Sequence, residues 1–147
     1  MSFSIDKSNS VNILSKRLKA APDVITRKVQ EIINQSVLNI ENNARARAPY
    51  GDTYKLKGSI YSIPYNMSTG AKVGSSVYYS PFVEFGTGSS FQIPFYRNLN
   101  MNQLEGYAQT FKRNKGNVVN LPHRPFLFLS ASEELYKMVN QIKKIKI

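Results

Sequence analysis

Apolar residues recur at helical spacing between residues 22 and 47 more regularly than anywhere else in this 147-residue chain. Pro22 suits a first helical turn, where its missing N–H would have no partner. Pro49 ends the pattern, because the residue before a proline avoids helical geometry. We therefore predict one long amphipathic helix over about residues 22–47. Its apolar stripe is expected to pass through Ile25, Val29, Ile32, Ser36 and Ile40, flanked by Val24, Ile33, Val37 and Ala44.

A second helix is predicted near the end of the chain, over residues 132–146, with Ser132 as its N-cap. Between the helices, residues 56–65 and 77–85 are rich in β-branched and aromatic residues and predict strands, although Pro81 would confine the second to a sheet edge. An apolar helix stripe must be buried against another layer. The sequence therefore predicts an α+β fold, in which the two helices pack on a small, mainly antiparallel sheet.

The chain length suggests a single domain over residues 22–147, preceded by a polar N-terminal arm of residues 1–21. Residues 88–121 mix Gly, Asn and Gln with isolated aromatics, which predicts a long inserted loop. We hypothesise that this insertion is mobile in the monomer and becomes ordered against a neighbouring subunit. Its interface anchors would be aromatic, namely Phe91, Phe95, Tyr96, Tyr107 and Phe111.

The chain is strongly basic. Twenty Lys and Arg face nine Asp and Glu, for a net charge of +11, which favours binding to nucleic acid, anionic membranes or acidic protein surfaces. The chain contains no cysteine, so disulfides and thiol catalysis are excluded. No apolar window is long enough to span a membrane, and the first residues do not read as a signal peptide. No metal-ligand spacing or phosphate-binding loop is found, and we expect no cofactor and no metal.

The most aromatic window, YYSPFVEFGTG at residues 78–88, contains a single acid, Glu84. A carboxylate in apolar surroundings costs free energy unless it is paired or hydrogen-bonded. We interpret Glu84 as a structural anchor, held by backbone N–H groups of the turn at residues 86–88 or by an arginine. Arg124 is the leading arginine in this chain, and a contact between Glu84 and a partner protein is the alternative.

Three stretches resemble, in the same order, segments of the tail-completion family of tailed bacteriophages, which are small head–tail joining proteins. YSPFVEFGT (79–87) is similar to the family's tyrosine–aromatic–Glu–aromatic–Gly-Thr signature. ARAPYGDTYKLKGSI (46–60) resembles its Ala-Pro, Thr-Gly, Leu, Ser-Ile segment, and RPFLFLSA (124–131) resembles its Arg-Pro-Phe-Leu segment. Two positions depart from the pattern: Tyr54 stands where the family has Gly, and Ser130 where it has Pro.

The resemblance implies a structural virion protein without enzymatic activity. Such a neck, connector or tail-completion subunit joins portal-side proteins to the tail during virion assembly, after synthesis in the host cytoplasm. The resemblance also implies a homo-oligomeric ring of six or twelve copies, contacts with neighbouring neck, portal-side and tail proteins, DNA passing through the channel, and no membrane partner. The structural or interaction residues that it implies are Glu84, Phe85, Gly86, Thr87, Arg124, Pro125 and Phe126.

Two other functions stay open. The alternative is a basic nucleic-acid-binding module, since Lys and Arg are plentiful and Tyr and Phe side chains can stack on bases. No helix-turn-helix pattern or aromatic RNA-binding signature accompanies them. The third hypothesis is a small hydrolase that uses Glu84 together with His123, the single histidine. General acid–base chemistry needs a second titrating group near Glu84, and no sequence neighbour supplies one.

Overall fold

The computed structural model describes residues 2–5, 23–49, 54–65, 70–112 and 119–145. Their fold is α+β, as the sequence predicts. In chain order the elements are β1 (Ser2–Ile5), α3 (Asp23–Arg47), α4 (Lys55–Ser59), β2 (Ile60–Tyr65), β3 (Gly70–Ser75), α5 (Ser80–Phe85), the 3-10 helix η1 (Gly88–Ser90), α6 (Met101–Gln109) and α7 (Leu127–Lys143).

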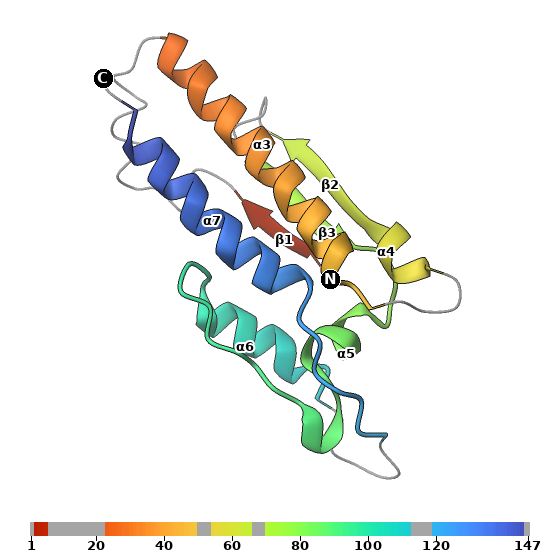
Figure 1. Cartoon of the computed structure of the whole chain (residues 1–147). Helices are drawn as coiled ribbons and strands as arrows, with labels where there is room; N and C mark the ends of the chain where they lie inside the picture. Colours follow the sequence, from red (N-terminus) through yellow and green to blue (C-terminus); the bar gives the residue numbers. More distant parts are fainter. Residues whose placement is uncertain (1, 6–22, 50–53, 66–69, 113–118, 146–147) are drawn as a thin grey trace.

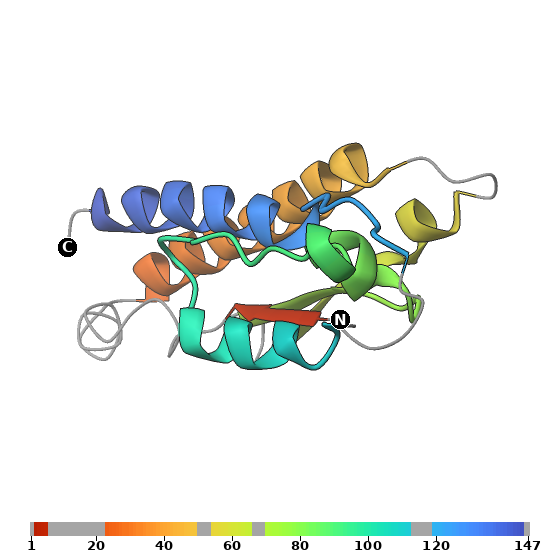
Figure 2. The same cartoon turned by 90° about the horizontal axis from the view of Figure 1, so that it is seen from below.

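The two long helices form one layer and the sheet forms the other. α3 and α7 lie side by side and antiparallel, with the sheet beneath them (Figure 1 and Figure 2). The sheet has the order β1-β3-β2 with both pairs antiparallel, and its register sets Ser62 and Phe3 on either side of Val73. Ser2–Ile5, expected within an N-terminal arm, therefore supply an edge strand, while residues 6–21 of that arm lie outside the described residues.

The first core lies between α3, α7 and the sheet. The bounds predicted for α3 are confirmed to within one residue. Its buried stripe passes through Ile33 and Val37, which were expected at the flanks, whereas Ile25 and Ile32 are only half-buried. Each large side chain buried here contributes about 1.5–3 kcal/mol. The core includes Val29, Ile33, Val37, Ile40, Ala44, Ile60, Val73, Phe126, Leu127, Leu135, Met138 and Ile142.

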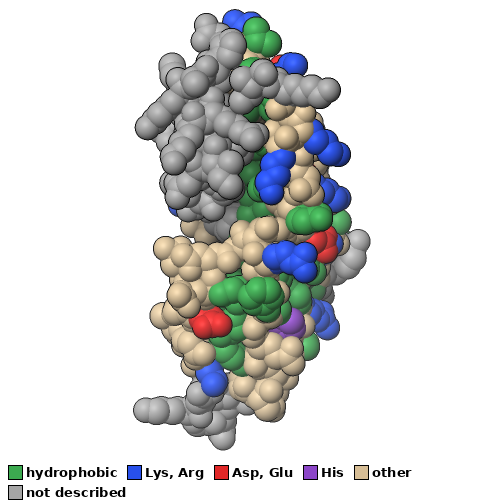
Figure 3. Space-filling model, turned by 90° about the vertical axis from the view of Figure 1, so that its left-hand side faces the viewer, with side chains coloured by type: hydrophobic (Ala, Val, Ile, Leu, Met, Phe, Trp, Pro, Cys, Tyr) green, Lys and Arg blue, Asp and Glu red, His purple; other side chains and the backbone are tan. Residues whose placement is uncertain are grey.

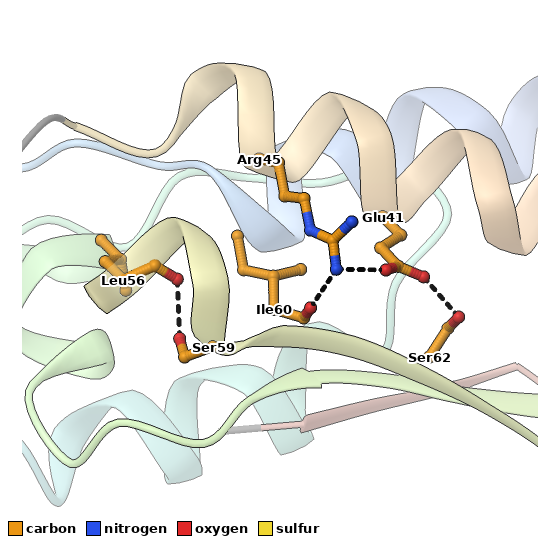
Figure 4. A network of polar contacts seen from close by, with 6 residues as sticks. All are labelled: Glu41, Arg45, Leu56, Ser59, Ile60 and Ser62. Carbon is orange, nitrogen blue, oxygen red and sulfur yellow. Dashed lines mark hydrogen bonds and ion pairs between the residues drawn. The ribbon is translucent and has the colours of Figure 1, made fainter. Parts of the chain in front are cut away.

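A polar network ties the end of α3 to the start of β2 (Figure 4). Arg45 donates to the Ile60 carbonyl at 2.8 Å and pairs with Glu41 at 2.6 Å, and Glu41 accepts a hydrogen bond from the Ser62 hydroxyl at 2.5 Å. The Arg45 side chain is 45% exposed, so its ion pair alone contributes little to stability. Because the network satisfies the carbonyl at the start of β2, it fixes the position of α3 along the strand.

Three local predictions are wrong. Residues 56–59 belong to α4, so the strand begins only at Ile60. Residues 80–85, expected to be extended, form α5, because Pro81 occupies the first helical turn, where no N–H is needed. α7 begins at Leu127, and Ser132, the predicted N-cap, lies inside the helix. No helix of the described residues is long and apolar enough to cross a membrane.

The insertion carries structure of its own. It contains η1 and α6, and Asn100 caps α6 by accepting a hydrogen bond from the Gln103 N–H at 3.2 Å. Of the aromatics predicted to be interface anchors, Phe91, Tyr96 and Tyr107 pack in or against the second core, and Phe111 packs on Phe82 and Tyr107. Residues 113–118 lie outside the described residues. The second core consists of Phe85, Tyr96, Leu104, Ala108 and Phe128, with Phe91, Ile93, Leu99, Met101, Tyr107 and Leu129 packed against it.

Candidate functional site

Glu84 is buried at the start of α7 and accepts three backbone hydrogen bonds. Its side chain is almost fully enclosed, with a residue exposure of 1%. One carboxylate oxygen, Oε2, accepts from the N–H groups of Phe126 at 2.9 Å and Leu127 at 3.0 Å, and the other, Oε1, accepts from Phe128 at 2.9 Å. We call these four residues the Glu84 clasp. It joins the end of α5 to the first turn of α7.

The Glu84 clasp supplies the hydrogen-bond acceptors that the start of α7 lacks. The first N–H groups of a helix have no partner within it, and the helix dipole gives that end a partial positive charge. Phe126, the N-cap residue, makes no capping side-chain bond. The carboxylate that serves instead comes from 42 to 44 residues earlier in the chain. This distant cap lets α7 begin at Leu127, without a capping residue of the usual kind beside it.

Backbone contacts extend the clasp along the segments that enter and leave the insertion. The Arg124 N–H donates to the Val83 carbonyl at 3.0 Å. The Thr87 N–H donates to the Leu121 carbonyl at 3.1 Å, and the Leu121 N–H returns a bond to the Thr87 hydroxyl at 2.9 Å. That hydroxyl in turn donates to the Val119 carbonyl. The two ends of the insertion are therefore held together beside Glu84.

Gly86 is required by the close approach of these two segments. Its φ of 75° lies in the left-handed region, which glycine adopts without strain. A Cβ there would lie 2.6 Å from the Ser90 carbonyl oxygen and 2.9 Å from both the Leu121 oxygen and the His123 nitrogen. All three contacts are with backbone atoms, which cannot move aside independently. The Gly86-Thr87 pair therefore allows the segments that enter and leave the insertion to pack against each other.

The aromatic neighbours of the clasp belong to different cores. Phe85 is fully buried and stacks on Phe128, with ring centroids 5.8 Å apart. Phe126, which follows the half-buried Pro125, is also fully buried but packs in the first core with Leu127. The Glu84 clasp thus lies at the junction of the two cores and fixes one against the other.

The interpretation of Glu84 as an anchor is confirmed, but both partners suggested for it are wrong. Its hydrogen bonds come from residues 126–128 and not from the turn at residues 86–88. Arg124 is exposed, and it contributes its backbone N–H, to Val83, instead of its guanidinium. Among the described residues, the ion pairs involve Arg45 and Arg47.

Arg47 makes a second link to α7 that the sequence analysis missed. It donates to the Ser130 hydroxyl at 3.0 Å and pairs with Glu133 at 2.5 Å. Ser130 is fully buried and donates to the Phe126 carbonyl at 2.6 Å, so its hydroxyl both accepts and donates. Proline, which the resembling family has at this position, provides neither bond. The departure at Ser130 was visible in the sequence, but its partner Arg47 was not.

Burial raises the pKa of Glu84 from 4.5 to about 7, against the three N–H bonds, which favour the charged form. Burial also raises the pKa of Tyr96 and Tyr107, and the nearby Glu84 charge adds to both shifts. Arg47 opposes the shift at Tyr96. The carboxylate is thus costly to ionise and is surrounded by groups that stay neutral around pH 7.

The contacts that the hydrolase hypothesis needs are not formed. Both carboxylate oxygens of Glu84 accept hydrogen bonds from backbone N–H groups, which do not titrate. The His123 Nε2 atom is buried without a hydrogen-bond partner among the described residues, and burial lowers the pKa of His123. In the described parts of the chain, no group of three or more His, Cys, Asp or Glu is placed to hold a metal ion.

Tyr54 has a backbone conformation that glycine usually occupies. Its φ of 53° and ψ of 19° are left-handed, and it is the one non-glycine residue with positive φ in the described chain. Glycine adopts this conformation freely, whereas a side chain raises its energy. Tyr54 therefore occupies a backbone conformation that favours glycine.

The chain matches no protein-family model, no curated protein and no solved structure. What the protein does must therefore be inferred from its own residues and their arrangement.

Replacing Glu84 tests the clasp. Glu84→Ala leaves three buried N–H groups without an acceptor and is expected to lower the free energy of unfolding by about 3 kcal/mol or more. Arg124→Ala, at an exposed neighbouring side chain, is the control and is expected to change it by about 0.5 kcal/mol or less. Urea denaturation of both variants and of the double variant measures the coupling, which we expect to be absent. If the losses in the free energy of unfolding were not additive in the double variant, Arg124 would be a partner of Glu84 after all.

The raised pKa of Glu84 predicts how stability changes with pH. The folded state holds this proton more tightly than the unfolded state, so the stabilisation is complete below pH 4.5 and is lost as the pH rises through about 7. The full effect is about 3 kcal/mol. Glu84→Gln cannot titrate at this position. Between pH 4.5 and 8, urea denaturation should show the parent losing stability relative to this variant, and parallel curves would contradict the shift.

Tyr54 offers a test of backbone strain. Tyr54→Val introduces a β-branched residue at positive φ, and we expect a loss of about 1 kcal/mol or more in the free energy of unfolding. Tyr54→Gly removes the strain while it increases the freedom of the unfolded chain, so we expect little net change or a small gain. Thermal denaturation of both variants compares them directly. A glycine variant less stable than the valine variant would show that the Tyr54 side chain, and not its backbone, decides stability here.

Proposed function

We propose that this protein is a structural subunit of the head–tail junction of a tailed bacteriophage, and a member of the tail-completion family. In this role it forms a ring of six or twelve copies in the neck of the virion and joins portal-side proteins to the tail during assembly. It acts by shape and contact, without catalysis.

The convergence of the three family-like segments around one helix end carries the proposal. Glu84, from the segment at residues 79–87, caps the helix that begins in the segment at residues 124–131. Arg47, from the segment at residues 46–60, contacts Ser130 in the third segment. Side chains far apart in sequence thus share one structural task. A signature made of such residues is what a common fold would preserve, and the left-handed backbone at Tyr54 fits the same pattern.

The chemistry of the clasp favours a role in assembly over catalysis. The carboxylate of Glu84 is enclosed, and its hydrogen bonds are directed at the protein's own backbone. Such a group stabilises one arrangement of α5 and α7 and offers no reactive atom to a substrate. A firmly fixed joint between two cores suits a subunit that must present defined surfaces to its neighbours.

The net charge of the chain favours binding partners that carry negative charge. A net charge of +11 attracts acidic protein surfaces and the DNA that passes through a phage neck. The same charge makes copies of the chain repel one another, and this repulsion weakens as salt screens it. Ring formation by the protein alone should therefore increase with ionic strength.

Electron microscopy and mass photometry of the purified protein test the proposal. We expect ring-shaped particles, more abundant at about 200 mM salt than at about 50 mM salt. The same preparations should be tested for binding to duplex DNA, because nucleic-acid binding falls steeply over that salt range. Tight, salt-sensitive duplex binding by a monomer that forms no particles would overturn the proposal in favour of a nucleic-acid-binding module.

A further inference from the structure

Phe95 is the exception among the aromatics of the insertion. The other four, Phe91, Tyr96, Tyr107 and Phe111, pack in or against the second core or on each other. The Phe95 residue is 79% exposed. A single exposed apolar side chain is common on protein surfaces and implies nothing by itself. What distinguishes Phe95 is that the residues after it are held by hydrogen bonds and that an exposed arginine follows two positions along the chain.

The residues that follow Phe95 are fastened to α6 and α7. Tyr96 is buried, and its N–H donates to the Met101 sulfur at 3.3 Å. The Leu99 N–H donates to the Tyr96 carbonyl at 3.3 Å, and the Asn98 amide donates to the Ser132 carbonyl of α7 at 3.4 Å. Phe95 is therefore presented from a fixed backbone, so a partner that covers it would order little besides the side chain.

Arg97 lies two residues after Phe95 in the chain. Both are exposed, whereas Tyr96 between them is buried in the second core. Arg97 takes part in neither of the ion pairs of the described residues. Figure 3 shows hydrophobic side chains gathered on the lower part of one face, where α6 lies in Figure 1, with acidic side chains as well as Lys and Arg side chains around them.

We propose that Phe95 and Arg97 form a docking surface for an acidic segment of another protein. An apolar side chain of the partner covers Phe95, and a carboxylate of the partner pairs with Arg97. Aromatic and arginine side chains are the residues that most often dominate binding energy at interfaces. The net charge of +11 draws an acidic partner toward the surface. This inference deepens the proposed function, on which the identity of that partner as a neck or tail protein rests.

Two other occupants fit less well. A second copy of this chain carries the same +11 charge, so it lacks the charge attraction that would bring an acidic segment to Arg97. A single-stranded nucleic acid needs a series of basic side chains to follow its backbone beside the stacking aromatic. Arg97 is the one basic residue between positions 91 and 99. The pairing of one aromatic with one arginine therefore fits a carboxylate next to an apolar side chain better than a run of phosphates.

Selection from a displayed library of random 12-residue peptides tests the surface without any phage component. The full chain serves as the bait. We expect enriched peptides that combine Asp or Glu with Leu, Phe or another large apolar residue. Their affinity should fall at least tenfold for Phe95→Ser and for Arg97→Ala. Tyr136→Ser is the matched control, since Tyr136 is an aromatic on α7 that is 52% exposed, and it should change affinity less than twofold.

Several results would overturn the inference. These are no enrichment above the starting library, enriched peptides without acidic residues, or peptides whose binding does not depend on Phe95. Binding of an oligothymidine probe that is lost in Phe95→Ser would assign the surface to nucleic acid. Self-association of the parent that is lost in Phe95→Ser, measured by sedimentation velocity, would assign it to a second copy. The peptide selection and the oligothymidine test do not depend on ring formation, so the docking surface and the proposed function can fail separately.

Discussion

A buried carboxyl group and a helix end reduce each other's desolvation penalty at the junction of the two cores. Burying the Glu84 carboxylate without partners would cost several kcal/mol, and each uncapped N–H at the buried start of α7 would cost about 1–3 kcal/mol. Placed together, they satisfy one another through three hydrogen bonds. If α5 or the first turn of α7 shifted, the buried carboxylate and N–H groups would lose their hydrogen-bond partners. The contact fixes the first turn of α7 beside α5, and α7 continues from there into the first core.

The same contact explains how the chain accommodates a long insertion. Phe126 and Leu127 pack in the first core, whereas Phe85 and Phe128 pack in the second. Bonds between Thr87 and Leu121 close the insertion at its base, and Gly86 allows the two segments to approach. The insertion is thus a lobe that is closed at its base, and its apolar side chains pack around Phe85 and Phe128, which lie outside it. A lobe closed at its base can vary in length and sequence at small cost to the rest of the fold.

The elements that were predicted well depend on local sequence, and the others depend on distant contacts. The bounds of α3 followed from its apolar period and its flanking prolines. α5 was mistaken for a strand, because Phe82, Val83 and Phe85 have strand propensity, while the helix depends on tertiary context. The start of α7 was misplaced, because its cap lies 42 residues away. The apolar neighbours of Glu84 predicted that its carboxylate needs hydrogen-bond donors. Which donors these are could not be predicted, because that requires knowing where α7 begins.

Charge links the proposed ring to the proposed docking surface. Two of the arginines of α3 are paired with glutamates, so the described ion pairs leave the excess of basic residues unchanged, and that excess opposes contact between copies. An acidic partner bound at Arg97 lowers the net charge of each subunit and so reduces this repulsion. Subunits carrying the partner would then associate more readily than free ones. Such coupling would favour ring formation by subunits that already carry a partner, and it would give the order of assembly an electrostatic contribution.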